Sequence, residues 1–420
     1  MLVIYGYGIT GKALQKYAQR RDIRHVIVDG LRSDALAPDD FDEWTEVSDV
    51  VVSPGISVCD RFVLRAEEHR VRVIGAFQYA YERLPEIKLI SVTGTNGKST
   101  VVTMITGILK KAGLNVFSAG NIGIPLISIV DQVCEGDIIV AELSSYQLEW
   151  TNNLKSDISI LLNLTEDHLA RHQTFAEYRR CKEKLIGFTG KGTVLYHPEF
   201  FSVRRSGALS LFRDFDFDGN KFTGPGILLS GIKPVLPGRH NEMNTAFAIM
   251  ASFLAGADKE AVLSFLGEFT GLPHRLEYCG KYRNISFIND SKSTTFESTY
   301  AAVSSFHEKI VLIISGELKQ GMDVHRFLKR LRHTDKICMI CVFGDLAGKF
   351  RTVDTDDVLL YPEYEIKGLF RILTEKYQNE RVNVLFSPGL PSFDYFRNFE
   401  HRGDFFKENI KGFLNEKKEC

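Results

Sequence analysis

The stretch "LISVTGTNGKST", residues 89–100, decides the fold of the middle of this 420-residue chain. Its apolar first half is typical of a buried strand, and its second half is a glycine-containing loop that opens a helix. Gly94 and Gly97 let backbone N–H groups converge on phosphate oxygens. Lys98 adds a positive charge at the outer phosphates, and Ser99 offers a hydroxyl to a magnesium ion. Although a valine replaces the first glycine of the general G-x-x-x-x-G-K-[ST] pattern, the stretch predicts a nucleoside triphosphate site in an α/β fold.

A second glycine-rich loop, "GYGITG" at residues 6–11, follows the short apolar run "LVIY" and opens another helical pattern. Its G-x-G-x-x-G spacing allows a tight turn and a close approach of the backbone to a diphosphate at a helix N-terminus. Asp29 ends the next predicted strand, where an acidic residue fits such a site. The alternative is that the glycines serve only helix packing. Two loops predict two phosphorylated ligands: a triphosphate that reacts, and a nucleotide or nucleotide-sugar handle on a substrate.

The composition is that of a globular protein, with 44% hydrophobic and 25% charged residues. A net charge of −1 gives no electrostatic reason to expect binding to nucleic acid or an anionic membrane. No apolar stretch approaches the roughly 20 residues needed to span a bilayer, and the N-terminus has no basic leader. We therefore expect a cytoplasmic protein without membrane insertion. We also expect a monomer. The seven cysteines indicate reduced thiols, and the C-x-x-C at residues 338–341 lies in a predicted core strand, which favours core thiols over a redox or zinc site.

Strand and helix patterns alternate along most of the chain, which predicts parallel sheets with crossover helices. Charged or turn-forming stretches around Pro85 and at 270–278 mark two boundaries. The predicted fold class is α/β with three domains, namely an N-terminal Rossmann-like, a central P-loop ATPase-like and a C-terminal Rossmann-like domain, at residues 1–86, 87–272 and 273–420.

Three further residues follow or lie near predicted strands of the central segment. Glu142 ends the apolar strand "DIIVAE", where a carboxylate can meet the ion held by Ser99. His168 stands in "NLTEDHLARH" after the strand "SILLN", and on its own it would be taken for a surface histidine. Lys182 lies in a helix predicted over 174–188, where its plain interpretation is a solvated charge.

Eight motifs then occur in the order found in one family: "GTNGKST", "GNIGIP", "ELSSYQLE", "NLTEDHL", "LPGRHNEMN", "LPHRLE", "NDSKST" and "SPGLPSFD". Over its whole length the chain resembles the Mur ligases, the ATP-dependent amide ligases of peptidoglycan precursor synthesis. Within them it is most similar to the branch that adds D-glutamate to UDP-N-acetylmuramoyl-L-alanine. The resemblance implies an acid–amino-acid ligase in which ATP phosphorylates the substrate carboxylate and the amine of D-glutamate attacks the acyl phosphate. It also implies that the first loop holds UDP and the second holds ATP.

The resemblance carries roles to individual positions. ATP binding falls on Gly94, Thr95, Asn96, Gly97, Lys98, Ser99, Thr100, Asn244, Arg275 and Asp290. Catalytic roles fall on Lys98, Glu142, His168 and Lys182. The resemblance implies two magnesium sites with Ser99, Glu142, His168 and Lys182 as ligands, and it implies that Lys182 is carbamylated. The UDP-substrate side falls on Ile9, Thr10, Asp29, Ser53, Gly55, Asn121, Ser144 and Gln147. The pocket for the incoming amino acid falls on Lys292, Thr294, Lys319, Ser392 and Phe399.

The chain departs from the family pattern at two places. Ala170 stands where the family commonly has aspartate, and Glu317 and Leu318 stand where aspartate and a small residue are more usual. The second departure bears on Lys319 and on which amino acid is added. The alternatives are another Mur-type or folylpolyglutamate-type ligase, a nicotinamide dehydrogenase using "GYGITG", and a P-loop nucleotide-binding switch protein. A dehydrogenase leaves "GTNGKST" unexplained, and a folate ligase has no use for the first loop.

Overall fold

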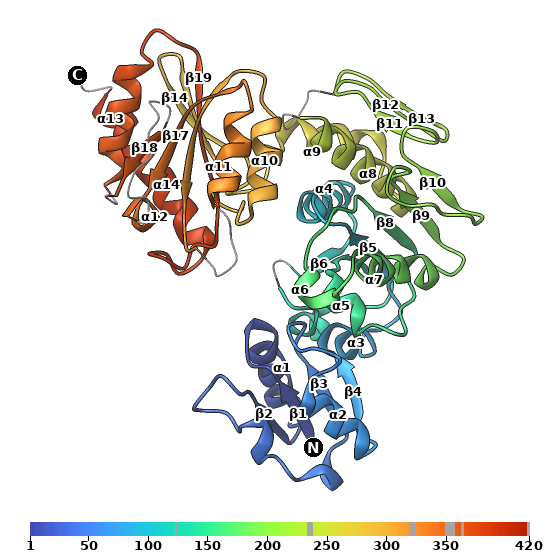
Figure 1. Ribbon diagram of the computed structural model, residues 1–420. Coiled ribbons are helices and arrows are strands. Elements are labelled where there is room, and N and C mark those ends of the chain that lie inside the picture. The colour runs from blue at the N-terminus through green and yellow to red at the C-terminus, as the bar shows by residue number, and fades with distance from the viewer. Residues whose placement is uncertain (122–123, 233–237, 319–323, 349–357, 363–364, 418–420) are drawn as a thin grey trace. The chain divides into compact units, whose positions relative to one another are not determined.

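The computed structural model describes residues 1–121, 124–232, 238–318, 324–348, 358–362 and 365–417. These form two compact units. The first comprises residues 1–234 and 240–269, and the second comprises residues 235–239 and 270–420. Each unit is an α/β structure built on parallel strands (Figure 1), which confirms the predicted fold class.

The first unit begins with a four-stranded parallel sheet in the order β2-β1-β3-β4. Its strands are short runs rich in Val and Ile, and the two central strands are largely buried, as expected of parallel strands. They are β1 (Leu2–Tyr5), β2 (His25–Val28), β3 (Asp49–Val52) and β4 (Arg72–Gly75). The accompanying helices are α1 (Ile9–Arg20), α2 (Arg61–Glu68) and α3 (Ala76–Tyr81), with 3-10 turns η1 (Pro38–Asp40) and η2 (Trp44–Glu46). Because β1 lies between β2 and β3, the segments that follow these three strands meet at one edge.

The second sheet of this unit has six parallel strands in the order β10-β9-β8-β5-β7-β6. They are β5 (Lys88–Thr93), β6 (Val116–Gly120), β7 (Ile138–Glu142), β8 (Ile158–Leu161), β9 (Thr193–Tyr196) and β10 (Ala208–Ser210). The "GTNGKST" loop follows β5, which lies between β7 and β8. The loop therefore opens at the carboxyl edge of the sheet, where ligands bind in α/β folds.

Helices and a small antiparallel sheet complete the first unit. The helices are α4 (Lys98–Lys111), α5 (Ser145–Glu149), α6 (Leu169–His172), α7 (Phe175–Phe188), α8 (Arg239–Ala255) and α9 (Lys259–Glu268), with η3 (Leu126–Ser128) and η4 (Val130–Gln132). The antiparallel strands are β11 (Asp216–Phe217), β12 (Phe222–Gly224) and β13 (Ile227–Leu229). The helix predicted over 174–188 is confirmed as α7. It begins after Thr174 because the hydroxyl of that residue accepts the N–H of Glu177 and caps the helix.

One hydrophobic core spans both sheets of the first unit. It includes Leu14 and Ala80 from the first sheet's helices and Leu126 and Leu148 from the second segment, all buried. The Trp150 side chain packs closely on Gly75. A Cβ on Gly75 would lie 2.5 Å from the Cβ of Trp150. The predicted domains 1–86 and 87–272 thus share a unit, each with a sheet of its own, and their division stays a prediction.

The second unit has a six-stranded sheet in the order β14-β15-β19-β16-β17-β18. Its strands are β14 (Glu277–Tyr282), β15 (Ile285–Asn289), β16 (Lys309–Ser315), β17 (Ile337–Phe343), β18 (Val358–Tyr361) and β19 (Val382–Gly389). Its helices are α10 (Phe296–Ser304), α11 (Val324–Arg332), α12 (Asp345–Gly348), α13 (Ile366–Lys376) and α14 (Phe399–Glu416). The edge strand β14 runs antiparallel to β15 through a tight turn at Arg283, whose φ is +50°, and the sequence analysis did not predict it.

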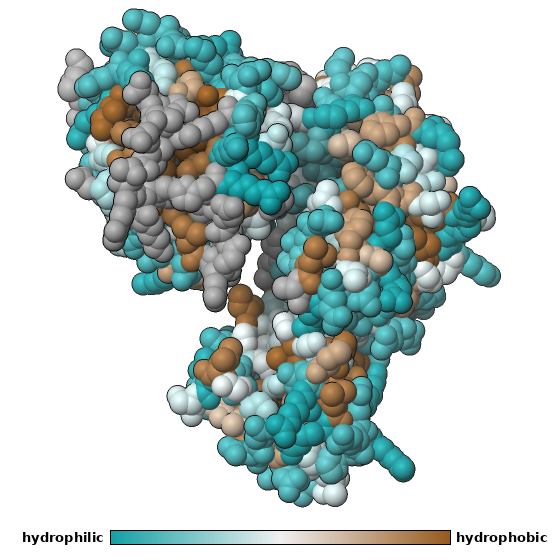
Figure 2. Space-filling model, viewed as in Figure 1, coloured by the Kyte–Doolittle hydropathy of each residue, from teal (hydrophilic) through white to brown (hydrophobic). Residues whose placement is uncertain are grey.

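The C-x-x-C lies within β17, where Cys341 is buried and Cys338 half-buried, as predicted for core thiols. Hydrophobic side chains are interspersed with hydrophilic ones on the face of the first unit that Figure 2 shows. In the described parts of the chain, no helix is long and apolar enough to cross a membrane.

Candidate nucleotide-binding and catalytic site

The loop between β5 and α4 has the backbone that phosphate binding requires. Gly94 and Gly97 have φ values of +156° and +86°, which L-residues with a Cβ rarely adopt. A Cβ on Gly97 would also lie 2.4 Å from Oδ1 of Asn244, so this predicted ATP residue packs directly against the loop. Ser99 and Thr100 lie in the first turn of α4 and are buried. Because α4 begins directly after Gly97, the backbone N–H groups of its first turn lie at the end of the loop where a phosphate would bind.

Residues that follow β8 hold the loop in place. Asn163 accepts the N–H of Asn96 through Oδ1 (2.8 Å) and donates through Nδ2 to the Asn96 carbonyl (3.0 Å). The Thr95 hydroxyl donates to the carbonyl of Thr165 (3.2 Å) and lies 3.0 Å from the hydroxyl of Tyr178. Sequence reasoning quoted "NLTEDHL" but gave Asn163 and Tyr178 no role. The signal for Asn163 was its place at the carboxyl end of the strand next to β5.

Two lysines converge on one carbonyl of the loop. Nζ of Lys98 and Nζ of Lys182 each donate to the carbonyl of Gly94, both at 2.8 Å. The Lys182 side chain is 1% exposed, and its Nζ lies 4.7 Å from the ring centroid of Tyr178. The plain interpretation of Lys182 as a solvated helix charge is therefore wrong, because α7 packs this face against the loop. Burial, and secondly the charge of Lys98, lower the pKa of Lys182 well below its ordinary value.

Glu142 and His168 lie beside these lysines. Glu142 is 2% exposed, and its Oε2 is buried without a hydrogen-bond partner, while Oε1 accepts from Nδ2 of Asn121 at 3.4 Å. His168 precedes α6 at a φ of +55°, and its Nδ1 lies 3.2 Å from the hydroxyl of Tyr146. Burial lowers the pKa of His168, and the charges of Lys182 and Lys98 lower it further, against the opposing effect of Asp167.

These groups fit a magnesium ion at the predicted position. Mg²⁺ binds through one or two carboxylates together with phosphate oxygens and water. The unpaired Oε2 of Glu142 is a hard anionic oxygen without a protein donor, the state expected of a ligand atom. No group of three or more His, Cys, Asp and Glu side chains suited to a metal forms among the described residues. The predicted set of Ser99, Glu142, His168 and Lys182 would thus rely on phosphate oxygens for the remaining ligands.

The glycine loop at residues 6–11 lies where β1, β2 and β3 end. The carboxylate of Asp29 accepts the N–H groups of Tyr7 (2.7 Å) and Leu31 (2.8 Å), and the Ser53 hydroxyl donates to the carbonyl of Gly6 (2.7 Å). Asp29 and Ser53 therefore shape the loop. A Cβ at position 11 would lie 2.2 Å from the Gly6 carbonyl oxygen, so that glycine is needed for helix packing.

Gly8 has no such structural reason to be glycine. Its φ is −75°, and a Cβ there would meet nothing within 4 Å. It caps α1 without a side-chain bond, so the first-turn N–H groups of α1 receive no acceptor from it. Ile9, directly after it, is 79% exposed. The packing around Gly8 does not require a glycine at this position. The close approach of a diphosphate to the start of α1 would explain it.

The remaining predicted UDP-substrate residues lie nearby in the same unit. Thr10 and Gln147 line a small cavity together with Gly120 and Pro54. Ser144 and Gln147 form a capping box at α5, in which the Ser144 hydroxyl donates to Oε1 of Gln147 at 3.0 Å. Their side chains are thus partly engaged with each other.

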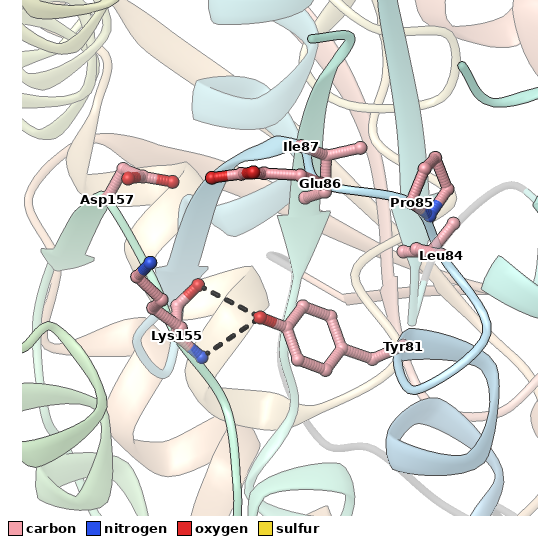
Figure 3. A pocket seen from close by; sticks show the side chains of 7 residues that line it. All are labelled: Tyr81, Leu84, Pro85, Glu86, Ile87, Lys155 and Asp157. Carbon is pink, nitrogen blue, oxygen red and sulfur yellow. Dashed lines mark hydrogen bonds between the residues drawn. The ribbon is translucent and has the colours of Figure 1, made fainter. Parts of the chain in front are cut away.

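A larger cavity of about 210 Å³ lies at the opposite edge of the second sheet (Figure 3). The Tyr81 hydroxyl bonds to the backbone N–H and carbonyl of Lys155 (3.2 and 3.4 Å), and the carboxylates of Glu86 and Asp157 point toward one another. Since Asp157 precedes β8, this cavity lies at the amino ends of the strands. It is not the phosphate site.

In the second unit, the predicted residues gather where β15, β19 and β16 end. Asp290 is 3% exposed, and its carboxylate accepts from the Ser387 hydroxyl (2.7 Å) and the N–H of Leu276 (3.2 Å). Burial raises the pKa of Asp290 to about 6. Nζ of Lys292 lies 5.4 Å from the ring centroid of Phe399. The structure thus brings Lys292 and Phe399 together, whereas Lys319 lies outside the described residues.

Arg402 joins the loops of this group, and sequence reasoning missed it. It is fully buried on α14 and donates to the carbonyls of Ser291 (3.0 Å), Leu390 (3.0 Å) and Ser315 (3.3 Å). These carbonyls belong to the segments that lead to Thr294, Ser392 and residue 319. Burial lowers the pKa of Arg402 to about 10. An arginine three positions after Phe399 in a helix was the available signal.

Comparison with known proteins decides the family. Residues 92–198 match the family described as Mur ligase middle domain. The chain is 31% identical to a UDP-N-acetylmuramoylalanine–D-glutamate ligase of Thermoanaerobacter pseudethanolicus, with 97% of each chain covered. It is 34% identical to the ligase of the same name from Synechocystis, covering 87% of this chain and 85% of the relative. The chain belongs to the Mur ligase family.

The fold agrees with this assignment. The structure of Thermotoga maritima MurF ligase in complex with ADP matches with a TM-score of 0.60 at 15% identity, covering 89% of this chain and 97% of that one. The family match and the relatives at 31% and 34% identity confirm the predicted resemblance to the Mur ligases and its similarity to their D-glutamate branch.

The two departures from the Mur ligase pattern lie in different places. Ala170 lies in α6, between His168 and the end of that helix. Glu317 follows Gly316 after β16, and its N–H donates to the carbonyl of Pro391 (2.8 Å). Neither position alters the strands that carry the predicted site.

Proposed function

We propose that this Mur ligase joins D-glutamate to UDP-N-acetylmuramoyl-L-alanine with hydrolysis of ATP to ADP and phosphate. The observation that carries the proposal is that two phosphate loops, each at the carboxyl edge of its own parallel sheet, occur in a chain that matches D-glutamate ligases over 97% of its length. The γ-phosphoryl group of ATP passes to the free carboxylate, which gives an acyl phosphate and ADP. The D-glutamate amine then attacks the carbonyl carbon, loses a proton and displaces phosphate. Activation is needed because a carboxylate is a poor electrophile.

Each loop binds one nucleotide in this proposal. The loop of residues 6–11, with Ile9, Thr10 and the turn at Gly55, binds the UDP part, and Asn121, Ser144 and Gln147 lie toward the sugar. Residues 94–100 hold the triphosphate of ATP, and Asn244, Arg275 and Asp290 contact the adenine, ribose or phosphates. Lys98 neutralises charge on the transferring phosphoryl group, a contact expected to strengthen in the transition state.

Lys182 acts in the proposal as a carbamate. Burial lowers the pKa of the Lys182 amine well below its ordinary value, which favours the neutral form, the form that can attack CO₂. The nitrogen then forms a bond to carbon and releases a proton, which leaves an anionic group with two oxygens. An ammonium offers donors and no acceptor and cannot ligate a cation. Mg²⁺ at two sites, held by Ser99, Glu142, His168 and the Lys182 carbamate, would supply charge neutralisation between phosphate and carboxylate.

The second unit is proposed to select the amino acid. Lys292, Thr294, Lys319, Ser392 and Phe399 would line the pocket, with charge-assisted donors for the two carboxylates of glutamate. All predicted ligand regions lie on one chain, so the proposal needs no second copy. The reaction is proposed to take place in the cytoplasm, where ATP and UDP-sugars are made.

A coupled assay of ADP release tests the function. ADP is expected only when UDP-N-acetylmuramoyl-L-alanine and D-glutamate are both present, and L-glutamate, L-lysine and diaminopimelate should give little. Activity with a different amino acid would favour another Mur branch, and activity with a folate would favour a folylpolyglutamate-type ligase. Steady ATP hydrolysis without either substrate would favour a nucleotide switch, and reduction of NAD would favour a dehydrogenase.

A further inference from the structure

Arg171 connects three segments of the first unit. It lies on α6, a single turn flanked by His168 and Gln173, whose φ values are +55° and +61°. Its Nη1 donates to the carbonyl of Gly55 (3.1 Å), and its Nη2 donates to the carbonyl of Ile56. Nε and Nη2 also donate to one carboxylate oxygen of Glu149 at 2.9 and 2.6 Å. The Arg171 side chain is only 12% exposed, so these charge-assisted bonds are shielded from water.

At one end this contact reaches the loop of residues 6–11. Gly55 and Ile56 belong to the turn after β3, in which the N–H of Ile56 donates to the carbonyl of Ser53 (3.0 Å). The Ser53 hydroxyl in turn donates to the carbonyl of Gly6. Nε1 of Trp150 donates to the same Ile56 carbonyl at 2.9 Å, so the turn is held from α6 and from the end of α5.

At the other end the contact reaches the groups beside the "GTNGKST" loop. The guanidinium carbon of Arg171 lies 5.3 Å from the ring centroid of Tyr146. The hydroxyl of Tyr146 lies 3.2 Å from Nδ1 of His168, and the two rings are 4.9 Å apart. Arg171 and His168 also share the one-turn helix α6. A shift of the Gly55 turn would therefore displace α6 and His168 with it.

We propose that Arg171 is a positioning residue that fixes the turn at residues 53–56 relative to His168. It thereby sets the distance between the UDP-sugar on one loop and the γ-phosphate on the other. This inference rests on the proposed function, since a ligase must bring a carboxylate on one nucleotide-linked substrate to the phosphate of another. Arg171 touches no reacting atom. A misplacement of about 1 Å at a reacting centre can lower the rate about 10²-fold.

The test uses Arg171→Met and Arg171→Lys in the full chain. Dissociation constants for UDP-N-acetylmuramoyl-L-alanine alone and for ADP alone are measured by calorimetry, and kcat is expressed per ADP-binding site. Each ligand is expected to bind within about threefold of wild type, because the loops themselves remain, while kcat of Arg171→Met falls about 10²-fold. Lysine keeps the charge beside Glu149 but lacks the planar guanidinium group, so the kcat of Arg171→Lys is expected to fall about 10-fold. The matched control is Arg180→Met, whose guanidinium is 74% exposed and pairs with Glu177.

Three outcomes would overturn the inference. One is a kcat for both Arg171 variants equal to that of Arg180→Met. Another is a loss confined to UDP-substrate affinity, with full kcat at saturation, which would make Arg171 a binding residue. A third is a lower Tm with unchanged kcat per ADP site, the sign of a purely structural role. Should Arg171→Met fail to fold, Arg171→Lys decides alone. Absence of turnover in the wild type would refute the proposed function and, with it, the inference. If the wild type is active, any of the three outcomes above refutes the inference alone.

Discussion

Replacing Lys182 with methionine is expected to abolish turnover while the fold is almost unchanged. The Lys182 side chain is 1% exposed, and its Nζ donates to the Gly94 carbonyl at 2.8 Å. Losing that bond costs about 1 kcal/mol. Methionine is similar in length and flexible, so it fills the same space, and no amine remains to be desolvated. We expect the free energy of unfolding to change by about 1–2 kcal/mol or less. Turnover should fall about 10²–10³-fold or more, because an anionic ligand beside the transferring phosphoryl group is lost.

Urea unfolding and the coupled ADP assay measure the two effects on one preparation. Lys184→Met is the matched control on the same helix, since Nζ of Lys184 donates to the carbonyls of Leu148 and Glu149 (3.1 and 3.0 Å) and touches no predicted ligand. It should lose stability and retain kcat. A Lys182→Met enzyme with kcat within about threefold of wild type would refute the reasoning, because binding of the catalytic metal would then not involve this side chain.

Three further predictions concern other parts of the site. Asp290 has a pKa of about 6 in the folded state, against an ordinary value of 3.8. Between these two pH values the folded state binds more protons than the unfolded state. The free energy of unfolding of the wild type should therefore fall as the pH rises from about 4 to about 6. Asp290→Asn should lack this pH-dependent loss of stability, which is on the order of 3 kcal/mol. Parallel stability curves of wild type and Asp290→Asn from pH 4 to 7 would contradict the prediction. Gly97→Ala should destabilise by about 1–2 kcal/mol from its positive φ alone, and weaken ATP binding by displacing Asn244; calorimetry with ADP checks the second effect. Arg402→Met should lower the free energy of unfolding by about 3 kcal/mol or more, because it leaves the carbonyls of Ser291, Leu390 and Ser315 without their cationic donor. Chemical denaturation measures the loss, and a smaller one would show that the loops close without this arginine.

Sequence patterns predicted the parallel sheets well because buried strands and glycine loops are local signals. The runs "LVIY" and "LISVT" became β1 and β5, and the helix expected directly after the "GTNGKST" loop became α4. The edge strand β14 was missed because a short half-exposed antiparallel strand carries little periodicity.

The site was predictable where a motif defined it and unpredictable where only burial did. Lys182 looked like a surface charge in its own helix, and only packing of α7 on the loop revealed its burial. Arg171 and Arg402 were missed because both donate to backbone carbonyls of segments distant in sequence, and hydrophobic periodicity does not mark such carbonyls.

The central claim is that each loop binds its own nucleotide, and reciprocal calorimetry tests it most directly. A Cβ at position 8 would meet nothing within 4 Å, so the fold should tolerate Gly8→Val while the added side chain excludes the diphosphate. Lys98→Ala removes the charge at the other loop. Gly8→Val should lose affinity for UDP-N-acetylmuramoyl-L-alanine by about 10-fold or more and bind ATP normally, and Lys98→Ala should do the reverse. If each variant instead weakened both ligands equally, or if Gly8→Val bound the UDP substrate like wild type, the assignment of one nucleotide to each loop would be wrong.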